Sequence, residues 1–547
     1  MDTETVVSPP SESAKLFWNT PELLVMTFRH MRRADQARCA GLNKYSSEHA
    51  LDAIYRDNPP LENLLALLSP LAAVPRTGQP NSVEWKFTKA LRVADWDRFR
   101  HYSFRVRSLV KTIESFVLSQ ESMLDLFTTM PPGVAFLPCL TNLCWEEVDP
   151  STMSFVITLF NSKLKEVELT LAEAPIDSRI LLEQLSRRSP ELESLQFWTT
   201  DAEVNDSLAL SGLVEAVRSL PSLRSLELCA PMFNSPLLQQ LSQTNRRLKR
   251  LWFFIYGPDA SKMCSDDKED RSAESFSELR DVSIPSSGLT TLFGRHVEGY
   301  QLTFLHVAVD DDMTALRDNL SVVATSCSNL KHLSIMHHIN HPEASAAALS
   351  MEMVTPLLAL KSLQVLVIDH SEPPNLSNQD LQQISASFPE LQHFELCVRA
   401  RGRPKPISPT LECLIPFAQN CKKLISIGIF MDTSISPPLL RLNEIMFPPN
   451  FSAMHVQYSK IIDHISVVDF LISIFPAHAS LTISPYSPHL RYVSGPMALN
   501  FPGAMRQVDE ESAKSLQEWG RASRLLAGLS RARDLLDLRR QWSPETS

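Results

Sequence analysis

The short phrase L-x-x-L-x-L recurs along this chain, and it restricts the possible folds more than any other feature of the sequence. Its first leucine stands at positions 140, 164, 192, 223, 248, 279, 302, 330, 363, 391 and 424, at spacings of 23 to 33 residues. Alternation places two leucine-type side chains on one face of a strand, and that face is buried only when neighbouring repeats stack on it. The spacing therefore predicts a solenoid, an architecture that usually presents a binding surface.

A helical pattern precedes each phrase, as in Leu181, Leu182 and Leu185, and Cys327 and Cys421 stand three residues before the first leucine in two copies. The combination resembles the longer, helix-backed leucine-rich repeats, some of which carry Cys at this position. We predict an α/β fold over residues 136–450, in which a curved parallel sheet is backed by helices.

Charge and cysteine usage exclude several classes of protein. The 547 residues carry a net charge of −10 without a long Lys/Arg stripe, which argues against a nucleic-acid binder. Nine cysteines form no C-x-x-C pair, which favours a reducing compartment. No secretory signal and no run of 18 apolar residues is found, so we expect no membrane span and a cytoplasmic or nuclear location, or both.

The sequence nominates no catalytic constellation. Glycine-rich phosphate-binding motifs, G-x-S-x-G and H-E-x-x-H do not occur. His337, His338 and His341 cluster near Asp369-His370, but their spacing is too loose to indicate zinc. We therefore predict no enzymatic activity, no cofactor and no metal.

Residues 16–60 have the pattern of three short helices ahead of the repeats. Thr20 and Pro21 are suited to begin the first helix, and Leu24, Phe28 and Met31 then share one face. We expect a second helix from Asp35 to about Leu42, and a third that is capped by Ser46 or Ser47 and ends before Pro59-Pro60.

This run resembles an F-box, from Leu16 through Thr20-Pro21-Glu22-Leu23-Leu24, Phe28, Met31, Asp35-Gln36-Ala37-Arg38-Cys39-Ala40 and Leu42-Asn43-Lys44-Tyr45 to Tyr55-Arg56. The resemblance implies the substrate-recognition subunit of a cullin–RING (SCF-type) ubiquitin ligase, which acts in ubiquitin-dependent degradation. The F-box would dock the ligase adaptor subunit, and the repeats would hold the target protein. Carried over by position, the adaptor contacts would be Pro21, Leu23, Leu24, Phe28, Met31 and Leu42. The alternative is a leucine-rich-repeat scaffold without a ubiquitin role, whose N-terminal helices only cap the array.

The side chains that alternate with the buried leucines should line the concave face of the sheet. Many of them are aromatic, basic or otherwise typical of interfaces, which predicts capture of a protein or peptide. The predicted contacts are Trp198, Arg250, Trp252, Phe254, Phe304, His306, His332, Met336 and Phe430. The alternative is that the strand phase slips in these repeats, or that an insertion covers the face.

The remaining segments connect or close the array. We expect disorder over residues 1–15, a helical linker and N-terminal cap over 61–135, and degenerate repeats or a C-terminal cap over 451–500. Residues 501–547 should form a helix and a tail, with Leu516, Trp519 and Leu526 on the apolar side of the helix.

Overall fold

The computed structural model describes residues 12–76, 79–112, 117–172, 178–199, 207–229, 232–233, 235–245, 247–254, 276–295, 301–309, 316–337, 348–400, 404–438, 445–456, 458–483 and 510–542. The chain divides into two compact units, Met1–Leu223 and Arg224–Ser547, and each is described by itself. His338 and His341 lie outside the described residues.

The first unit begins with helices and a hairpin and continues into repeats. Its helices are α1 (Glu12–Asn19), α2 (Pro21–His30), α3 (Arg33–Ala40), α4 (Lys44–Arg56), α5 (Leu61–Leu65), α6 (Asp95–Ser103), α7 (Gln120–Thr129), α8 (Met153–Leu159), α9 (Ser178–Arg188) and α10 (Ser207–Arg218). Its strands are β1 (Leu71–Arg76), β2 (Gln79–Phe87), β3 (Ser108–Lys111), β4 (Asn142–Val148), β5 (Glu166–Leu171) and β6 (Ser194–Thr199).

The second unit consists of further repeats and a long final helix. Its strands are β7 (Ser225–Cys229), β8 (Arg250–Phe254), β9 (Asp281–Pro285), β10 (Phe304–Val309), β11 (His332–His337), β12 (Val365–Asp369), β13 (His393–Leu396), β14 (Ser426–Ile429), β15 (Asp432–Thr433), β16 (Ala453–His455), β17 (Lys460–Ile461) and β18 (Ser480–Thr482). Its α-helices are α11 (Ser235–Thr244), α12 (Leu289–Arg295), α13 (Leu316–Ser326), α14 (Met351–Val354), α15 (Asn378–Ser387), α16 (Leu414–Asn420), α17 (His464–Ile474) and α18 (Glu510–Trp542).

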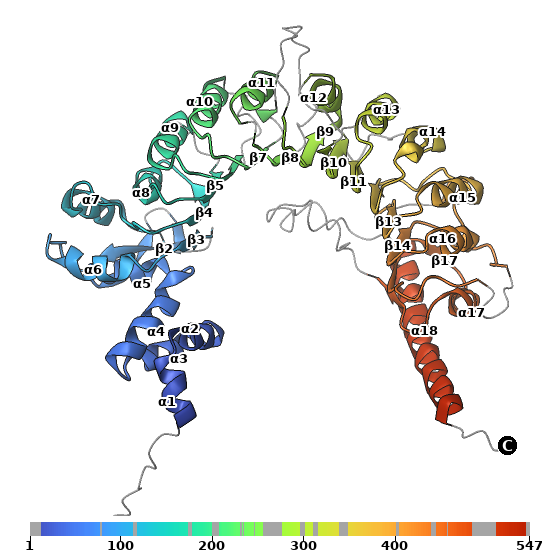
Figure 1. Cartoon of the computed structure of the whole chain (residues 1–547), viewed down its shortest axis with the longest axis horizontal. Coiled ribbons are helices and arrows are strands. Elements are labelled where there is room, and N and C mark those ends of the chain that lie inside the picture. Colours follow the sequence, from blue (N-terminus) through green and yellow to red (C-terminus); the bar gives the residue numbers. More distant parts are fainter. Residues whose placement is uncertain are drawn as a thin grey trace, which may run out of the picture. The chain divides into compact units, whose positions relative to one another are not determined.

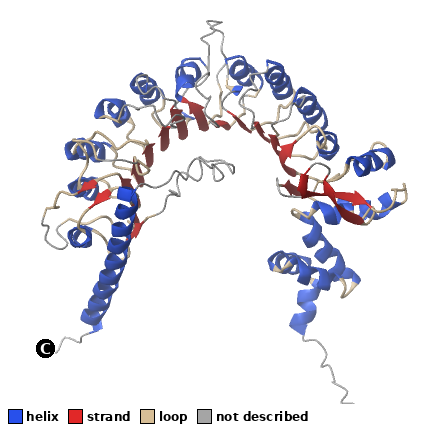
Figure 2. Ribbon diagram, turned by 180° about the vertical axis from the view of Figure 1, so that it is seen from behind, coloured by secondary structure: helices blue, strands red, loops and turns tan. Residues whose placement is uncertain are grey.

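The predicted repeat fold is confirmed. Strands β3–β14, β16 and β18 belong to a 14-stranded sheet in that order, and the registered pairs within it are parallel. Each of the eleven predicted first leucines is buried just ahead of one strand, from Leu140 before β4 to Leu424 before β14. The helices of the repeats lie on one side of these strands, as Figures 1 and 2 show.

In two repeats, the residue three positions before the first leucine forms hydrogen bonds to the repeat before it. Asn161 donates from Nδ2 to the carbonyls of Leu137 and Leu140, at 3.1 and 3.2 Å. Cys421 donates from Sγ to the carbonyls of Ser385 and Phe388. Burial raises the pKa of the Cys327 and Cys421 thiols to about 12, so both thiols remain protonated parts of the core.

The segment 61–135 is not only helical, as the sequence analysis expected. Strands β1 and β2 form an antiparallel hairpin, and β3 is the first strand of the large sheet. The repeat phrase is incomplete at β3, because its last inward position holds Lys111 instead of leucine. The buried ammonium of Lys111 lies 5.5 Å from the ring centre of Trp145 and donates to the Glu146 carbonyl.

The C-terminal repeats and α18 close the other end of the array. Strands β16 and β18 extend the sheet beyond residue 450, within the segment for which degenerate repeats or a C-terminal cap were expected. Residues 484–500 lie outside the described residues. On α18, Trp519 is fully buried and donates from Nε1 to the Ser459 carbonyl at 2.8 Å.

Of the segment 1–15 that we expected to be disordered, residues 12–15 are helical, because α1 starts at Glu12. Among the described residues, no helix combines the length and the apolarity that crossing a membrane would need.

Candidate interaction surfaces

The N-terminal module consists of α1–α4 and has a small core of its own. Leu24, Phe28 and Ala50 are buried together, and Met31 packs against them partly buried. Two of the six predicted adaptor contacts, Leu24 and Phe28, are therefore core residues of the module in the isolated chain. Of the other four, Met31 is partly buried, whereas Pro21, Leu23 and Leu42 are exposed, with 44% of Leu23 and 62% of Leu42 accessible.

Further apolar side chains of the module are exposed that the sequence analysis did not single out. Met26 is 61% exposed and lies three residues after Leu23, so both side chains are on the same face of α2. Tyr45 on α4 and Leu16 and Trp18 on α1 are exposed as well. Leu23 and Met26 therefore present two large apolar side chains together on one exposed face of α2.

Three polar residues of the N-terminal module form hydrogen bonds to backbone groups of its helices. Gln36 is buried and donates from Nε2 to the carbonyls of Phe28 and Met31, which end α2. Asn43 caps α4 by accepting the backbone N–H of Ser46 at 2.8 Å. The cap therefore comes from Asn43 and not from Ser46 or Ser47. Thr20 precedes α2 but donates its hydroxyl to the Leu16 carbonyl instead of capping α2.

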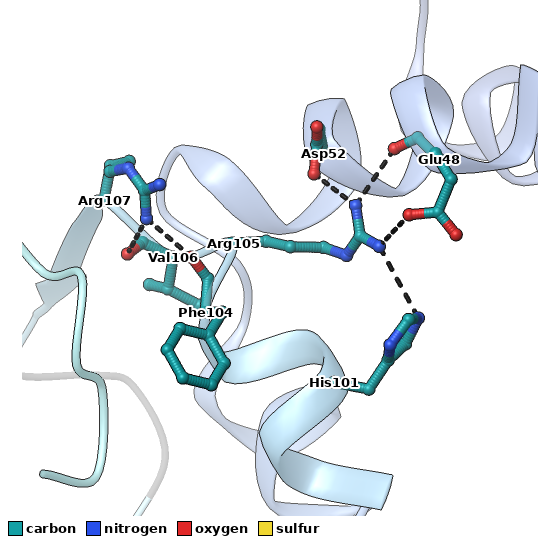
Figure 3. A network of polar contacts seen from close by, with 7 residues as sticks. All are labelled: Glu48, Asp52, His101, Phe104, Arg105, Val106 and Arg107. Atoms are coloured by element: carbon teal, nitrogen blue, oxygen red, sulfur yellow. Dashed lines mark hydrogen bonds and ion pairs between the residues drawn. The ribbon is translucent and has the colours of Figure 1, made fainter.

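Arg105 joins the module to the linker, as Figure 3 shows. Its guanidinium pairs with the carboxylates of Glu48 and Asp52 on α4 and donates to the Glu48 carbonyl at 3.1 Å. His101 on α6 lies 3.5 Å from the same guanidinium. The hydrogen bond from Arg105 lowers the pKa of Glu48, because it stabilises the ionised carboxylate.

The chain continues from α4 onto the edge of the large sheet. Asn58, with a left-handed φ of 50°, donates its backbone N–H to the Ser108 carbonyl at 2.9 Å. Its side-chain Oδ1 accepts the N–H of Val110, and Arg107 donates its N–H to the Arg56 carbonyl. The module thus pairs with β3, the first strand of the sheet, and covers the outer edge of that strand.

The face of the sheet that is turned away from the helices is called here the open face. In the second unit, strand register aligns its side chains in rows across the strands. The first row is partly or well exposed, and the second row is buried throughout. The first row consists of Ser225, Arg250, Asp281, Phe304, His332, Val365 and His393, and the second of Glu227, Trp252, Ser283, His306, Ser334, Val367 and Glu395.

The predicted phase of the strands is correct, but most of the predicted contacts are not accessible. Arg250, Phe304 and His332 belong to the first row and reach solvent, whereas Trp252 and His306 lie in the buried second row. Phe254, Met336, Phe430 and, in the first unit, Trp198 are buried as well. The sequence analysis missed Asp281 and Val365, which lie in the accessible first row beside Arg250 and His332.

A ladder of flat side chains runs across β8–β11. The Arg250 guanidinium lies 5.0 Å from the ring centre of Trp252, and Trp252 stacks on Phe304 at 5.6 Å. Phe304 in turn lies 4.3 Å from the His332 ring. Arg250 also approaches the carboxylates of Glu227 and Asp281, at 3.7 and 3.6 Å, and burial raises the pKa of Asp281.

A smaller polar cluster lies at the carboxyl ends of β11 and β12. His337 and His370 stack with ring centres 4.5 Å apart, and the Asp369 carboxylate pairs with Arg399. Burial lowers the pKa of His370. Within the described residues, no group of three or more His, Cys, Asp or Glu side chains is placed to hold a metal ion.

The open face of the first unit contains a polar hollow of about 230 Å³, lined among others by Asn142, Cys144, Glu166 and Glu168. Burial and the neighbouring carboxylate of Glu168 raise the pKa of the Cys144 thiol far above its ordinary value. Burial also raises the pKa of Glu168. A protonated thiol is a weak nucleophile, so these residues are not arranged for thiolate chemistry.

Comparison with known proteins adds little beyond the fold. No family model and no curated protein matches the sequence. A chain of the Rad7–Elc1 complex from yeast is 16% identical, with a TM-score of 0.34, over 60% of this chain and 79% of that one. A chain of the TLR13–ssRNA13 complex is 16% identical, with a TM-score of 0.33, over 65% of this chain and 45% of that one. The chain therefore spans under half of the second structure, and neither likeness is close enough to support a function.

Proposed function

We propose that this chain is the target-recognition subunit of a cullin–RING ubiquitin ligase, active in the cytoplasm, the nucleus or both. The N-terminal module docks the ligase adaptor subunit, and the open face of the repeats holds the target protein. The chain contributes no catalytic group, because holding a target beside a charged conjugating enzyme accelerates transfer by proximity.

The observation that carries this proposal is a folded helical module that presents Leu23, Met26 and Leu42 to solvent next to a repeat array. A module that only capped the array would be expected to bury its large apolar side chains against it. The direct bonding of the module to β3 supports a fixed placement of the module on the first repeats of its own unit.

The test is co-purification of the full chain with the ligase adaptor subunit. We expect wild-type binding, and a loss of binding of at least about tenfold for Leu23→Asp/Leu42→Asp, because two carboxylates would be buried in an apolar contact. The matched control is Ile435→Asp/Ile462→Asp, which changes two equally exposed side chains of the second unit. Substitutions at Leu24 and Phe28 are unsuitable, since both residues hold the module together.

A leucine-rich-repeat scaffold without a ubiquitin role is the second candidate. It is favoured by the pairing of Asn58 with Ser108, through which the module also covers the edge of the sheet. Failure of the wild-type chain to bind the adaptor, or equal loss in the control variant, would remove the ligase proposal and leave the scaffold.

A further inference from the structure

A row of exposed cations lies at the amino ends of the strands in the second unit. Arg224, Lys249, Arg280 and Lys331 each directly precede a strand, and all four are exposed. Their backbones are neighbours: Lys249 donates its N–H to the Arg224 carbonyl at 2.8 Å, and Arg280 donates to Lys249 at 2.9 Å. Thr303 continues the ladder to Lys331. We call these four cations the basic edge.

The side chains of the basic edge are not neutralised within the part of the chain that the structure describes. No carboxylate there lies within ion-pair distance of any of the four, and the nearby Asp281 pairs with Arg250 instead. Arg280 has a smaller effect on the pKa of Asp281 than burial or Arg250 has, so Asp281 does not neutralise Arg280. The corresponding positions of the first unit differ, because Lys165, which precedes β5, pairs there with Glu193, which precedes β6, at 3.1 Å.

Three like charges on adjacent strands oppose folding, since their mutual repulsion is not offset by paired carboxylates. The arrangement is also unexpected in a chain with a net charge of −10. An anionic partner that binds to the basic edge would relieve this repulsion, which gives the four cations a functional reason.

We propose that the basic edge binds an extended acidic segment, rich in Asp and Glu, of a partner protein. Adjacent strands are about 4.8 Å apart, so Arg224 and Lys331 are separated by roughly 19 Å, the length of about six extended residues. The first row of the open face lies beside the basic edge and offers Phe304 and Val365 for an apolar side chain of the same segment. The overall negative charge of the chain favours a short acidic peptide over a nucleic acid, which is a much longer polyanion.

This inference deepens the proposed target-holding role and rests on it. The probe is a fluorescein-labelled peptide with six consecutive glutamates, titrated with the full chain at low ionic strength and followed by anisotropy. We expect binding that Arg224→Gln/Lys249→Gln/Arg280→Gln weakens about tenfold, as three exposed charge contacts of about 0.5 kcal/mol each would imply. The control Arg317→Gln/Arg524→Gln/Arg531→Gln removes the same charge from exposed helix positions and should change affinity less than about twofold.

Three outcomes overturn the inference: no binding of the glutamate peptide, equal weakening by both triple variants, or tighter binding of a six-nucleotide oligothymidylate than of the peptide. The adaptor experiment is independent, because Leu23 and Leu42 lie in the first unit. A chain that binds the adaptor but not the peptide loses only this inference. A chain that binds the peptide but not the adaptor retains the acidic-segment site and loses the ubiquitin role.

Discussion

At the scale of single residues, Trp252 illustrates how an open-face side chain becomes part of the structure. It is only 8% exposed, because Arg250 lies over one part of the ring and Phe304 stacks on it. Stacked aromatic pairs contribute beyond the area they bury. Trp252 therefore supports the surface that a partner meets, while Phe304 and Arg250 form that surface.

We expect Trp252→Ala to lower the free energy of unfolding by about 3 kcal/mol, since it removes a large buried ring. Phe304→Ala should cost about 1 kcal/mol, because its ring is partly exposed. Urea unfolding of both variants, followed by circular dichroism, measures the difference. A greater loss for Phe304 than for Trp252 would show that the burial of the two residues is assigned the wrong way round.

The face on which each residue lies could be predicted from the sequence, but its exposure could not. Alternation with Leu251 and Phe253 places Trp252 on the open face whatever its neighbours are. Its burial depends on Phe304, which is 52 residues away in sequence and reaches it only through the stacking of repeats. The basic edge was missed for the same reason, because its cations are scattered in the sequence and adjacent only in the sheet.

At the scale of elements, the Arg105 guanidinium bridges α4 and α6, which are also in contact through the rings of Tyr55 and Tyr102. Arg105 is 10% exposed, whereas Glu48 and Asp52 remain half exposed, so the pair lies at the boundary between module and linker. The folded-state pKa of Glu48 is lowered, so its contribution to stability is complete above the ordinary value of 4.5 and is lost as pH falls through the lower folded value.

Arg105→Gln should therefore lower the free energy of unfolding by about 1 kcal/mol at neutral pH. The difference in this free energy between variant and wild type should become smaller as the pH falls below the ordinary pKa of Glu48. Thermal unfolding across a pH series provides the measurement. Arg38→Gln is the control, since its ion pair with Asp35 lies on the surface and should matter little. A difference in stability between wild type and Arg105→Gln that stays constant with pH would mean that Arg105 acts through packing and not through its carboxylate partners.

The final helix α18 is attached through a few buried side chains. We expect Trp519→Ala to destabilise the closing elements by about 3 kcal/mol, since the indole is fully buried and bonded to Ser459. Hydrogen–deuterium exchange in α17 and β18 should accelerate, whereas Leu525→Ala, at a half-exposed position, should leave it nearly unchanged. Unchanged exchange in both variants would contradict the closing role of α18.

Elements with the full repeat phrase could be predicted, and those that break it could not. The eleven leucine positions located β4–β14 apart from their exact ends. Strand β3 was not predicted, because Lys111 stands where the repeat phrase has its last leucine. The ammonium group of Lys111 contacts the ring of Trp145 and donates to the Glu146 carbonyl. In the module, α2 begins at Pro21 as predicted, whereas α3 begins two residues before the predicted Asp35. The cap of α4 lies three or four residues before the predicted serines, because Asn43 accepts the backbone N–H of Ser46.

At the scale of the whole molecule, both outermost strands of the sheet are covered. The segment around Asn58 pairs with β3, and α18 lies against β18 through Ser523, whose hydroxyl donates to the Leu481 carbonyl. Uncovered strand edges recruit other chains, so these coverings protect the array from edge-to-edge association. From the sequence we expected a C-terminal helix to close one end of the array, but we did not predict that the segment around Asn58 would pair with β3.

The passage of α4 directly into the backbone pairing with β3 has a consequence for the cost of binding. The hydrogen bonds of Arg107, Asn58 and Val110 leave no flexible connection between the module and the first repeats. The module and the first repeats are therefore aligned during folding, and the conformational entropy of aligning them is lost at that stage. Binding of a partner that contacts both parts does not carry this entropic cost a second time. A partner that required another angle would first have to break these bonds, so the chain selects its complexes by geometry before any side chain is recognised.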